Sequence, residues 1–425
     1  MKVGPQQLAP RPAARRQDRR CLLQAAAASA ALGALGLPAL GRAQSGALNV
    51  GVLLPMSGTQ ALIGQSCRLG AAIAPAVLAD LGYRAPVKLL QADTETNVDT
   101  ARARAEKLIN DGAHVLVGPF DSGAAAAIAQ VAEQRGVPFV INIAAAPQIT
   151  EQGYQFVFRN FPTSVDLVRN GLALMRELFQ ATNVAPRSAV FMCVNDTFGV
   201  ANRKAIEAIL PRLDFLPFKI LDTIAYDPAA RDLSVEVAKA KSANADFLLL
   251  VSRLNDAILL RREMVRQRWT PMGVISPGSP GMYEKQFYQA LGKLSEYCIS
   301  NVPWYNPKAP LAGRLEAQLA KQFPQEQLMF HAVNVGYTFE AILIAADAYQ
   351  RARTTEPKAL AAAIRQTDIA ARAMLGGPIK FNAKGQVEGN LSACIQNLDL
   401  HPTVVLPAAS AQAKAVFPVP DYKKA

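Results

Sequence analysis

The sequence predicts an α/β protein built from two parallel sheets, each covered by helices on both faces. Short apolar runs, bounded by glycine, proline or polar turn residues, alternate along the chain with stretches of helical spacing. Strands that are buried on both faces read as continuous apolar runs, which is typical of parallel sheets. The alternation runs from about residue 48 to 142 and begins again after Pro162, so we expect two such units in series.

The first unit is expected to hold four strands and three helices. The strands are predicted at 48–54, 87–92, 115–117 and 139–142, and the helices at 64–81, at 100–110 and from Ser122 onward. Asp99 is a candidate N-cap of the second helix, and Gly112 marks its end.

The second unit repeats this rhythm. Its strands are predicted at 189–194, 218–224, 245–251 and 273–276, and its helices at about 202–210 and 256–267. A long helix at 333–351 comes late and has the length of a core element. The closing segment, 407–425, is predicted to be a loose tail.

The first 43 residues have the features of an export signal. Arg19 and Arg20 precede an Ala-rich apolar run that lasts to about Leu40, and Gly41-Arg42-Ala43 offers a small-residue cleavage site. This pattern predicts a secretory signal peptide over residues 1–43, and the arginine pair resembles the twin-arginine type. A single membrane anchor is the alternative, because the run is nearly long enough to span a membrane.

Charge and cysteine content narrow the class of protein. The formal net charge of +12 falls to +6 once residues 1–43 are set aside, and no basic stripe carries interleaved aromatics. Nucleic acid is therefore not an expected partner. Four cysteines remain, without a C-x-x-C pair, so disulfides and free thiols both stay open. They are Cys67, Cys193, Cys298 and Cys394.

The sequence carries no recognisable catalytic or metal-binding motif. It lacks a G-x-S-x-G elbow, a P-loop and an H-E-x-x-H helix, and its three histidines are scattered. The Gly292-Lys293 pair is followed by Leu294, where a P-loop needs Ser or Thr. We therefore expect a protein that is not an enzyme and that holds neither a metal nor a cofactor.

The loop after the strand at 115–117 is the best candidate for a binding site. The strand stops at Gly118-Pro119, and Ser122 then opens an Ala-rich helix. Ligands of open parallel sheets bind at the carboxyl ends of strands, and a helix N-terminus there favours a carboxylate or phosphate. Ser122 could add a hydroxyl group to such a site; alternatively, it merely caps its helix.

Several segments resemble Leu/Ile/Val-type periplasmic binding proteins. They occur in the order that is typical of that family, and together they cover roughly residues 47–405. The segments are VGVLLPMSG at 50–58 with Gly64 and Gly70, GPFDS at 118–122, AAAP at 144–147, the phrase at 154–161, and GPIKFNAKG at 377–385.

The resemblance implies a two-lobed type I periplasmic-binding-protein fold with three inter-lobe crossovers. Lobe one would comprise 46–163 and 302–378, and lobe two 164–301 and 379–425. A ligand in the inter-lobe cleft would favour the closed state of a periplasmic monomer, which would then dock on the membrane permease of an ABC importer. The alternatives are a periplasmic sensor of the same fold and an exported α/β enzyme.

The resemblance also implies ligand contacts, residue by residue. The carboxylate-binding serine falls on Ser122, next to Phe120, and the small-residue loop that also holds the carboxylate falls on Asn142, Ala144 and Ala145. From lobe two, an aromatic position falls on Phe198 and a second one near Arg253. The acid that pairs with an α-ammonium group falls on Gly278.

Gly278 departs from the family pattern because it carries no acid. A buried ammonium group without a counter-charge is costly, so we expect an organic or aromatic acid that lacks an α-amino group. Arg253, if it faces the cleft, would favour a second anionic or polar group; alternatively, it is a solvated residue at a strand end. Asp256, one helical turn away, could supply the missing acid, which keeps branched-chain amino acids possible.

Overall fold

The first sheet is parallel and has five strands, in the order β2-β1-β3-β4-β5. The strands are β1 (Leu48–Leu54), β2 (Val87–Asp93), β3 (Val115–Val117), β4 (Phe139–Ile141) and β5 (Val157–Arg159). Side chains alternate between the two faces of a strand, so Val50 and Val52 join one apolar cluster and Leu53 joins another. Both faces of this sheet are therefore buried.

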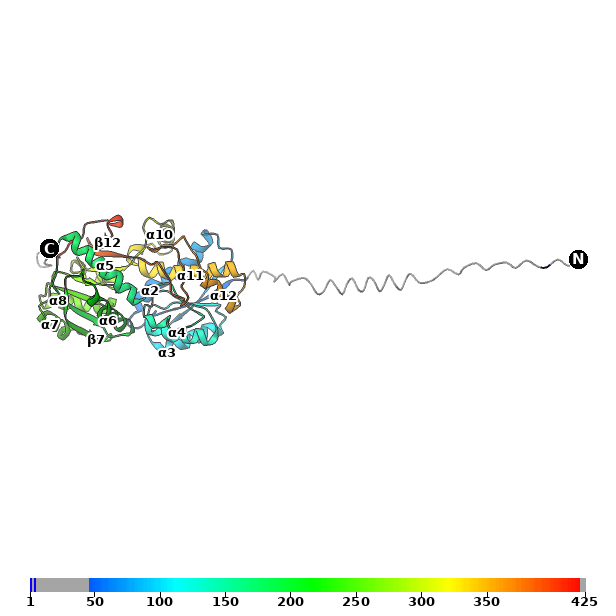
Figure 1. Ribbon diagram of the computed structural model, residues 1–425, viewed down its shortest axis with the longest axis horizontal. Coiled ribbons are helices and arrows are strands. Elements are labelled where there is room, and N and C mark those ends of the chain that lie inside the picture. Colours follow the sequence, from blue (N-terminus) through cyan, green and yellow to red (C-terminus); the bar gives the residue numbers. More distant parts are fainter. Residues whose placement is uncertain (2–3, 5–45, 421–425) are drawn as a thin grey trace. The chain divides into compact units, whose positions relative to one another are not determined.

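Helices from both ends of the chain cover the first sheet. They are α2 (Ala61–Asp80), α3 (Val98–Asn110), α4 (Ser122–Arg135), α10 (Pro310–Gln322), α11 (Ala332–Ala352) and α12 (Pro357–Arg365). Helix α11, from late in the chain, lies beside α2, while α3 packs against α4 (Figure 1). Helix α2 is long and apolar enough to cross a membrane by length and composition, but most of its residues are buried in this packing.

The second sheet has seven strands, in the order β12-β11-β10-β9-β8-β6-β7. The strands are β6 (Ser188–Val194), β7 (Lys219–Tyr226), β8 (Phe247–Val251), β9 (Val274–Ser276), β10 (Ile299–Pro303), β11 (Ser392–Leu398) and β12 (His401–Leu406). Its helices are α5 (Ser164–Thr182), α6 (Thr197–Ile209), α7 (Ser234–Ser242), α8 (Leu254–Arg266) and α9 (Lys285–Leu291). Strand β10 was not predicted, and β11 and β12 add two antiparallel pairings at one edge.

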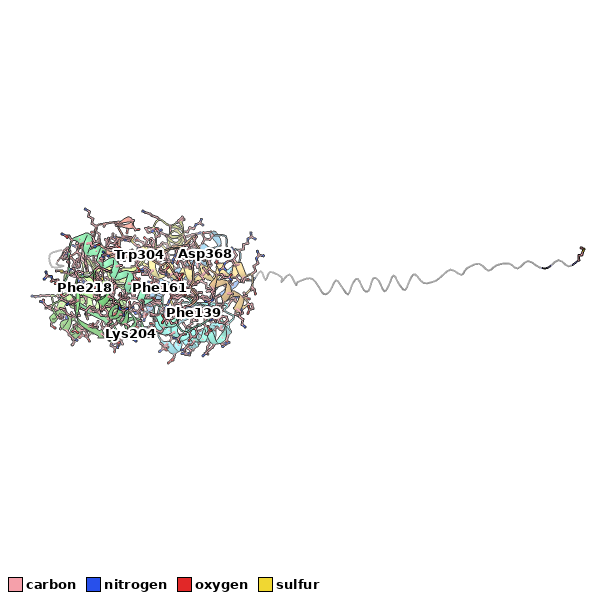
Figure 2. All side chains as sticks on the ribbon, viewed as in Figure 1. Phe139, Phe161, Lys204, Phe218, Trp304 and Asp368 are labelled. Carbon is pink, nitrogen blue, oxygen red and sulfur yellow. The ribbon has the colours of Figure 1, made fainter. Side chains whose placement is uncertain are left out.

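The computed structural model describes Met1, Gly4 and residues 46–420. The predicted signal peptide, apart from Met1 and Gly4, lies outside these residues, so its assignment stays a prediction. Within the described part, Phe139 belongs to the core around the first sheet and Phe218 to the core around the second (Figure 2).

The chain passes between the two sheets three times, after β5, after β10 and before β11. The last passage comes later than the expected boundary between 378 and 379. Gln386 bridges to Arg159 of β5, and the Phe381 ring lies 5.5 Å from the ring of Phe158. Residues 379–391 therefore pack with the first sheet. No local pattern marks this return, because the contacts that fix it join residues 227 positions apart.

Two local expectations need correction. Asn97, and not Asp99, caps α3, since its side chain accepts a hydrogen bond from the Thr100 amide. The described part of the closing segment is also packed and not loose. The Phe417 ring is buried 5.4 Å from the Phe179 ring, and the Val419 amide donates to the Met272 carbonyl.

The four described cysteines are all buried and unpaired. Burial raises the pKa of the Cys67 thiol to about 12, so that thiol is protonated at neutral pH. Within residues 46–420, three or more His, Cys, Asp or Glu side chains do not come together in a group that could hold a metal ion.

Candidate functional site

The strand order of each sheet reverses at one point, between β1 and β3 in the first sheet and between β6 and β8 in the second. Ligands of open parallel sheets bind outside the carboxyl ends of the strands at such points. Phe120 follows β3, Phe198 follows β6 and Arg253 follows β8. The topology thus places Phe120 and Arg253 on the loops where a ligand is expected, and Phe198 in the first turn of α6, which follows such a loop.

A small inner cavity of about 20 Å³ lies between these segments. Arg253 is the one charged side chain in its lining, and four of the lining residues are aromatic. The lining consists of Phe120, Ile143, Ala145, Phe161, Phe198, Arg253, Gly278, Pro280, Tyr283, Val302, Pro303 and Val333. Its lining resembles that of small-molecule sites, in which apolar and aromatic side chains surround a few polar anchors.

The structure brings five of the eight predicted site residues to this cavity: Phe120, Ala145, Phe198, Arg253 and Gly278. Ser122, Asn142 and Ala144 do not line it, although each is adjacent or nearly adjacent in sequence to a residue that does. The sequence pointed to neither Tyr283 nor Pro280 in the lining. The ring of Trp304 packs against that of Tyr283, with centroids 5.3 Å apart, and Trp304 is itself buried.

Ser122 is the first residue of α4 and does not cap it. Asp121 is the N-cap, and its Oδ1 accepts a hydrogen bond of 2.8 Å from the Ala124 amide. The Ser122 side chain is 1% exposed, and its Oγ has no hydrogen-bond partner among the described residues. The hydroxyl is therefore buried without a partner in the described part of the chain, and it is not part of the cavity lining.

The side chain of Asn142 connects the first sheet to α11. Its Nδ2 donates to Oγ1 of Thr338 at 2.8 Å, and the residue is fully buried. The amide nitrogen is thus already committed, whereas Oδ1 has no partner in the described part of the chain. Packing of the sheet against α11 accounts for this residue without a ligand.

Arg253 is not the solvated residue of the alternative interpretation, since it is only 7% exposed. Its guanidinium carbon lies 4.4 Å from the ring centroid of Phe198 and 4.9 Å from that of Phe120. Its Nε and Nη2 donate to Oδ2 of Asp196 at 3.0 and 2.8 Å, and Oδ2 of Asp121 lies 3.9 Å from Nη2. Arg253 thus joins aromatic and acidic groups from both lobes.

The charge of Arg253 is already partly balanced by acids of the chain itself. Burial opposes this charge, but Asp196 and Asp121 together raise the pKa of Arg253 above its ordinary value. Both acids line an outer, open hollow of about 850 Å³ and not the inner cavity. A ligand in the inner cavity would therefore share Arg253 with Asp196.

Asp256 does not take the place of the missing acid. Its carboxylate accepts hydrogen bonds from the Arg253 amide at 2.8 and 3.0 Å and from the Tyr226 hydroxyl at 2.6 Å. Burial raises its pKa to about 6. These contacts hold the start of α8, and Asp256 is not part of the cavity lining.

Gly278 sits where a side chain would be difficult to accommodate. Its φ is +150°, and an added Cβ would lie 2.8 Å from Cβ of Leu167. The Oγ of Ser276 accepts hydrogen bonds from the amides of Gly278 and Ser279 and fixes this loop. An acidic side chain at position 278 would therefore be difficult to accommodate in this loop.

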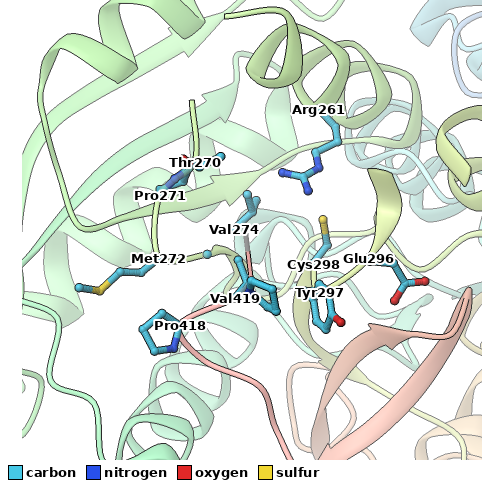
Figure 3. Close-up of a pocket in the computed structure, with 12 residues that line it drawn as sticks. Arg261, Thr270, Pro271, Met272, Val274, Glu296, Tyr297, Cys298, Pro418 and Val419 are labelled. Atoms are coloured by element: carbon cyan, nitrogen blue, oxygen red, sulfur yellow. The ribbon is translucent and has the colours of Figure 1, made fainter. Parts of the chain in front are cut away.

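A separate hollow of about 350 Å³ lies in the second lobe (Figure 3). Its two charged side chains bond within the chain: Arg261 Nε donates to the Leu294 carbonyl, and Glu296 accepts from the amides of Asp399 and Leu400. None of the predicted site residues lines this hollow.

Comparison with known proteins agrees with this architecture. The sequence model of a family described as periplasmic binding protein matches residues 47–395. The chain belongs to this family. The expected two-lobed type I fold is confirmed, and this periplasmic binding protein is similar to Leu/Ile/Val-binding proteins.

This periplasmic binding protein is 26% identical over 259 residues to Leu/Ile/Val-binding protein homolog 7 of Brucella abortus (strain 2308). The match covers 58% of the chain and 63% of the relative, so the chain spans less than two thirds of the length of that curated relative. A leucine-binding protein of Thermotoga maritima MSB8 matches with a TM-score of 0.70 and 20% identity, over 84% of this chain and 97% of that one.

A second solved structure is an ABC-transporter solute-binding protein from R. palustris in complex with benzoate. It matches with a TM-score of 0.71 and 18% identity, over 87% of this chain and 99% of that one. At such identities the structural likeness shows the fold.

Proposed function

We propose that this protein captures a small, largely apolar monocarboxylate in the inner cavity and delivers it to an ABC importer from outside the cytoplasm. One observation carries the choice of ligand: Arg253 is the single charged group in an otherwise apolar and aromatic lining. A carboxylate is the natural partner of a buried guanidinium, because charge-assisted hydrogen bonds are the strong ones. Since Asp196 already holds part of Arg253, the cavity suits one carboxylate and not two.

The cavity lining does not favour an α-ammonium group on the ligand. Gly278 offers no acid, and Asp256 is bound to Tyr226 and to the backbone of α8. Asp196 and Asp121 could receive an ammonium group only in competition with Arg253. An unpaired ammonium group in this apolar lining would be costly. The favoured ligand is therefore an organic acid without an α-amino group.

The aromatic lining favours an aromatic acid over an aliphatic one. Phe120, Phe161, Phe198 and Tyr283 all line the cavity, and aromatic pairs add to the free energy of burial. Solved relatives of the same fold are complexes with benzoate, 4-hydroxybenzoate, leucine or isoleucine. Each of these ligands carries one carboxylate on a mostly apolar body, which supports the proposed chemical class.

A thermal-shift screen tests the proposal. The protein would first be partly unfolded and refolded to remove any ligand carried through purification. Benzoate, 4-hydroxybenzoate and 4-methylpentanoate are each expected to raise the melting temperature, because a ligand of the native state stabilises it. If none of these acids raised it while leucine or isoleucine did, the assignment of an acid without an amino group would be wrong.

Replacing the free hydroxyl of Ser122 should weaken binding without unfolding the protein. We expect Ser122→Ala to lower benzoate affinity about tenfold, as for the loss of one hydrogen bond. The melting temperature without ligand should hardly change, because the Ser122 Oγ has no protein partner to lose. Titration calorimetry measures the affinity. Ser392→Ala, which removes another buried and unpartnered hydroxyl far along the chain, is the matched control. Equal benzoate affinity in the two variants would show that Ser122 does not contact the ligand.

A further inference from the structure

Arg159 is a fully buried cation without a neighbouring acid. The residue is 0% exposed, and none of the described carboxylates lies within ion-pair distance of its guanidinium. Arg372, the other deeply buried arginine of this lobe, is paired with Glu340 at 2.8 Å. Buried charges are ordinarily paired, so an arginine that is not paired calls for an explanation.

Neutral oxygen atoms satisfy the guanidinium of Arg159. Nε donates to Oε1 of Gln386 at 2.6 Å, and Nη2 donates to Oγ1 of Thr150 at 2.6 Å. Nη1 donates to the carbonyls of Ala144 and Ala146 at 3.3 and 2.7 Å. The hydrogen bonds solvate the cation but leave its charge uncompensated. Burial lowers its pKa to about 9, against the more distant acids Asp166 and Glu151, so it stays protonated at neutral pH.

The loop that Arg159 holds is the one that lines the inner cavity. Ile143 and Ala145 contribute to the lining, while the carbonyls of Ala144 and Ala146 accept from Arg159. In a trans peptide, the carbonyl and the next amide N–H point in opposite directions. The Ala145 amide therefore points away from Arg159, and the peptide dipole presents its positive end on the side opposite the guanidinium.

We propose that Arg159 is a positioning residue that makes this loop favourable for an anion. It aligns the loop peptides through their carbonyls, and its uncompensated charge attracts a carboxylate placed on the other side of the loop. The ligand carboxylate would then be the missing counter-ion. This inference rests on the proposed function, because it requires a ligand that carries a negative charge next to residues 143–146.

Comparing the affinities for the acid and the amide form of one ligand separates the effect of the Arg159 charge from a change in the shape of the loop. Benzoate and benzamide have nearly the same shape, but only benzoate is charged at neutral pH. Arg159→Gln removes the charge, whereas Arg159→Lys keeps it. Both variants lose the planar guanidinium group with its several N–H donors. We expect Arg159→Gln to lower the benzoate-to-benzamide affinity ratio about tenfold, as for a unit charge acting across a few ångströms of protein. In Arg159→Lys the ratio should stay near that of the native protein.

A second variant tests the same charge while leaving Arg159 in place. Gln386→Glu places a carboxylate beside Nε of Arg159, so the cation acquires a counter-ion but keeps its bonds to the loop. The affinity ratio should fall in this variant as well. It serves as the test if Arg159→Gln does not fold, and circular dichroism reports folding in each case.

The outcomes distinguish failure of the inference from failure of the proposed function. Equal losses of benzoate and benzamide affinity in Arg159→Gln, or an unchanged ratio in Gln386→Glu, would reduce Arg159 to a structural role. If the native protein bound neither benzoate nor 4-methylpentanoate, the proposed ligand class would fail, and the inference would fail with it. We expect the benzoate-to-benzamide affinity ratio to fall in Arg159→Gln and in Gln386→Glu, and to be preserved in Arg159→Lys.

Discussion

Replacing Arg253 with methionine is expected to lower the affinity for benzoate about a hundredfold, as measured by titration calorimetry. The variant loses the charge-assisted hydrogen bonds to the ligand. It also leaves Asp196 and Asp121, which now face Arg253 at 2.8 and 3.9 Å, without their common counter-charge. Their repulsion of an incoming carboxylate adds to the loss. Methionine keeps an unbranched apolar side chain beside Phe120 and Phe198, whose rings now contact the guanidinium carbon.

The double variant Arg253→Met with Asp196→Asn separates the two contributions. Asparagine can still cap α6 through its side-chain oxygen, as Asp196 does with the Gly199 amide at 2.7 Å. Because the double variant restores the charge balance, it should bind benzoate more tightly than the single variant but less tightly than the native protein. Unchanged or tighter binding in Arg253→Met would contradict the account, since it would mean that the guanidinium fills the cavity without holding the ligand.

Replacing Glu284 with glutamine is expected to make the stability of the protein much less dependent on pH. Glu284 is 1% exposed, and burial raises its pKa from 4.5 to about 8 although Asn334 donates to it at 2.9 Å. The folded state therefore favours the protonated acid. The stability that this proton provides is present below pH 4.5 and is lost as the pH rises through about 8. One pKa unit corresponds to about 1.4 kcal/mol, which sets an upper limit of roughly 5 kcal/mol for the loss.

Thermal unfolding at pH 5, 7 and 9, without ligand, measures this effect. Glu284→Gln should be close to the native protein at pH 5 and increasingly more stable than it at pH 7 and 9. His331 and the Lys285–Glu326 pair lie nearby, but both proteins contain them, so their titration cancels in the comparison. Parallel pH profiles for the two proteins would show that Glu284 is not held in its neutral form.

Local patterns in the sequence were sufficient to predict much of the first sheet and several loops of the site. Continuous apolar runs such as 48–54 identified the strands, and the turn after 115–117 pointed to the start of α4. The strand order then explains why Phe120, Phe198 and Arg253 meet. These features depend on residues that are close in sequence, or on a rule about the carboxyl ends of parallel strands.

Long-range pairing is what the sequence could not reveal. Arg253 was a candidate for the cleft, with a solvated strand end as the alternative, but its partner Asp196 lies 57 residues away, and no local spacing links the two. Arg159 was not singled out, because its isolation depends on which side chains surround it in space. The antiparallel edge strands β11 and β12 were missed for the same reason, since β11 pairs with a strand about ninety residues earlier.

The measurement that tests the central claim most directly compares each amino acid with the acid that lacks only its amino group. Titration calorimetry of the purified, ligand-stripped protein would use two pairs, 4-methylpentanoate with leucine and 3-phenylpropanoate with phenylalanine. Since the cavity offers no free acid to an α-ammonium group, the acid of each pair is predicted to bind more tightly than the amino acid. Tighter binding of leucine or phenylalanine than of its partner would contradict this account of the cavity.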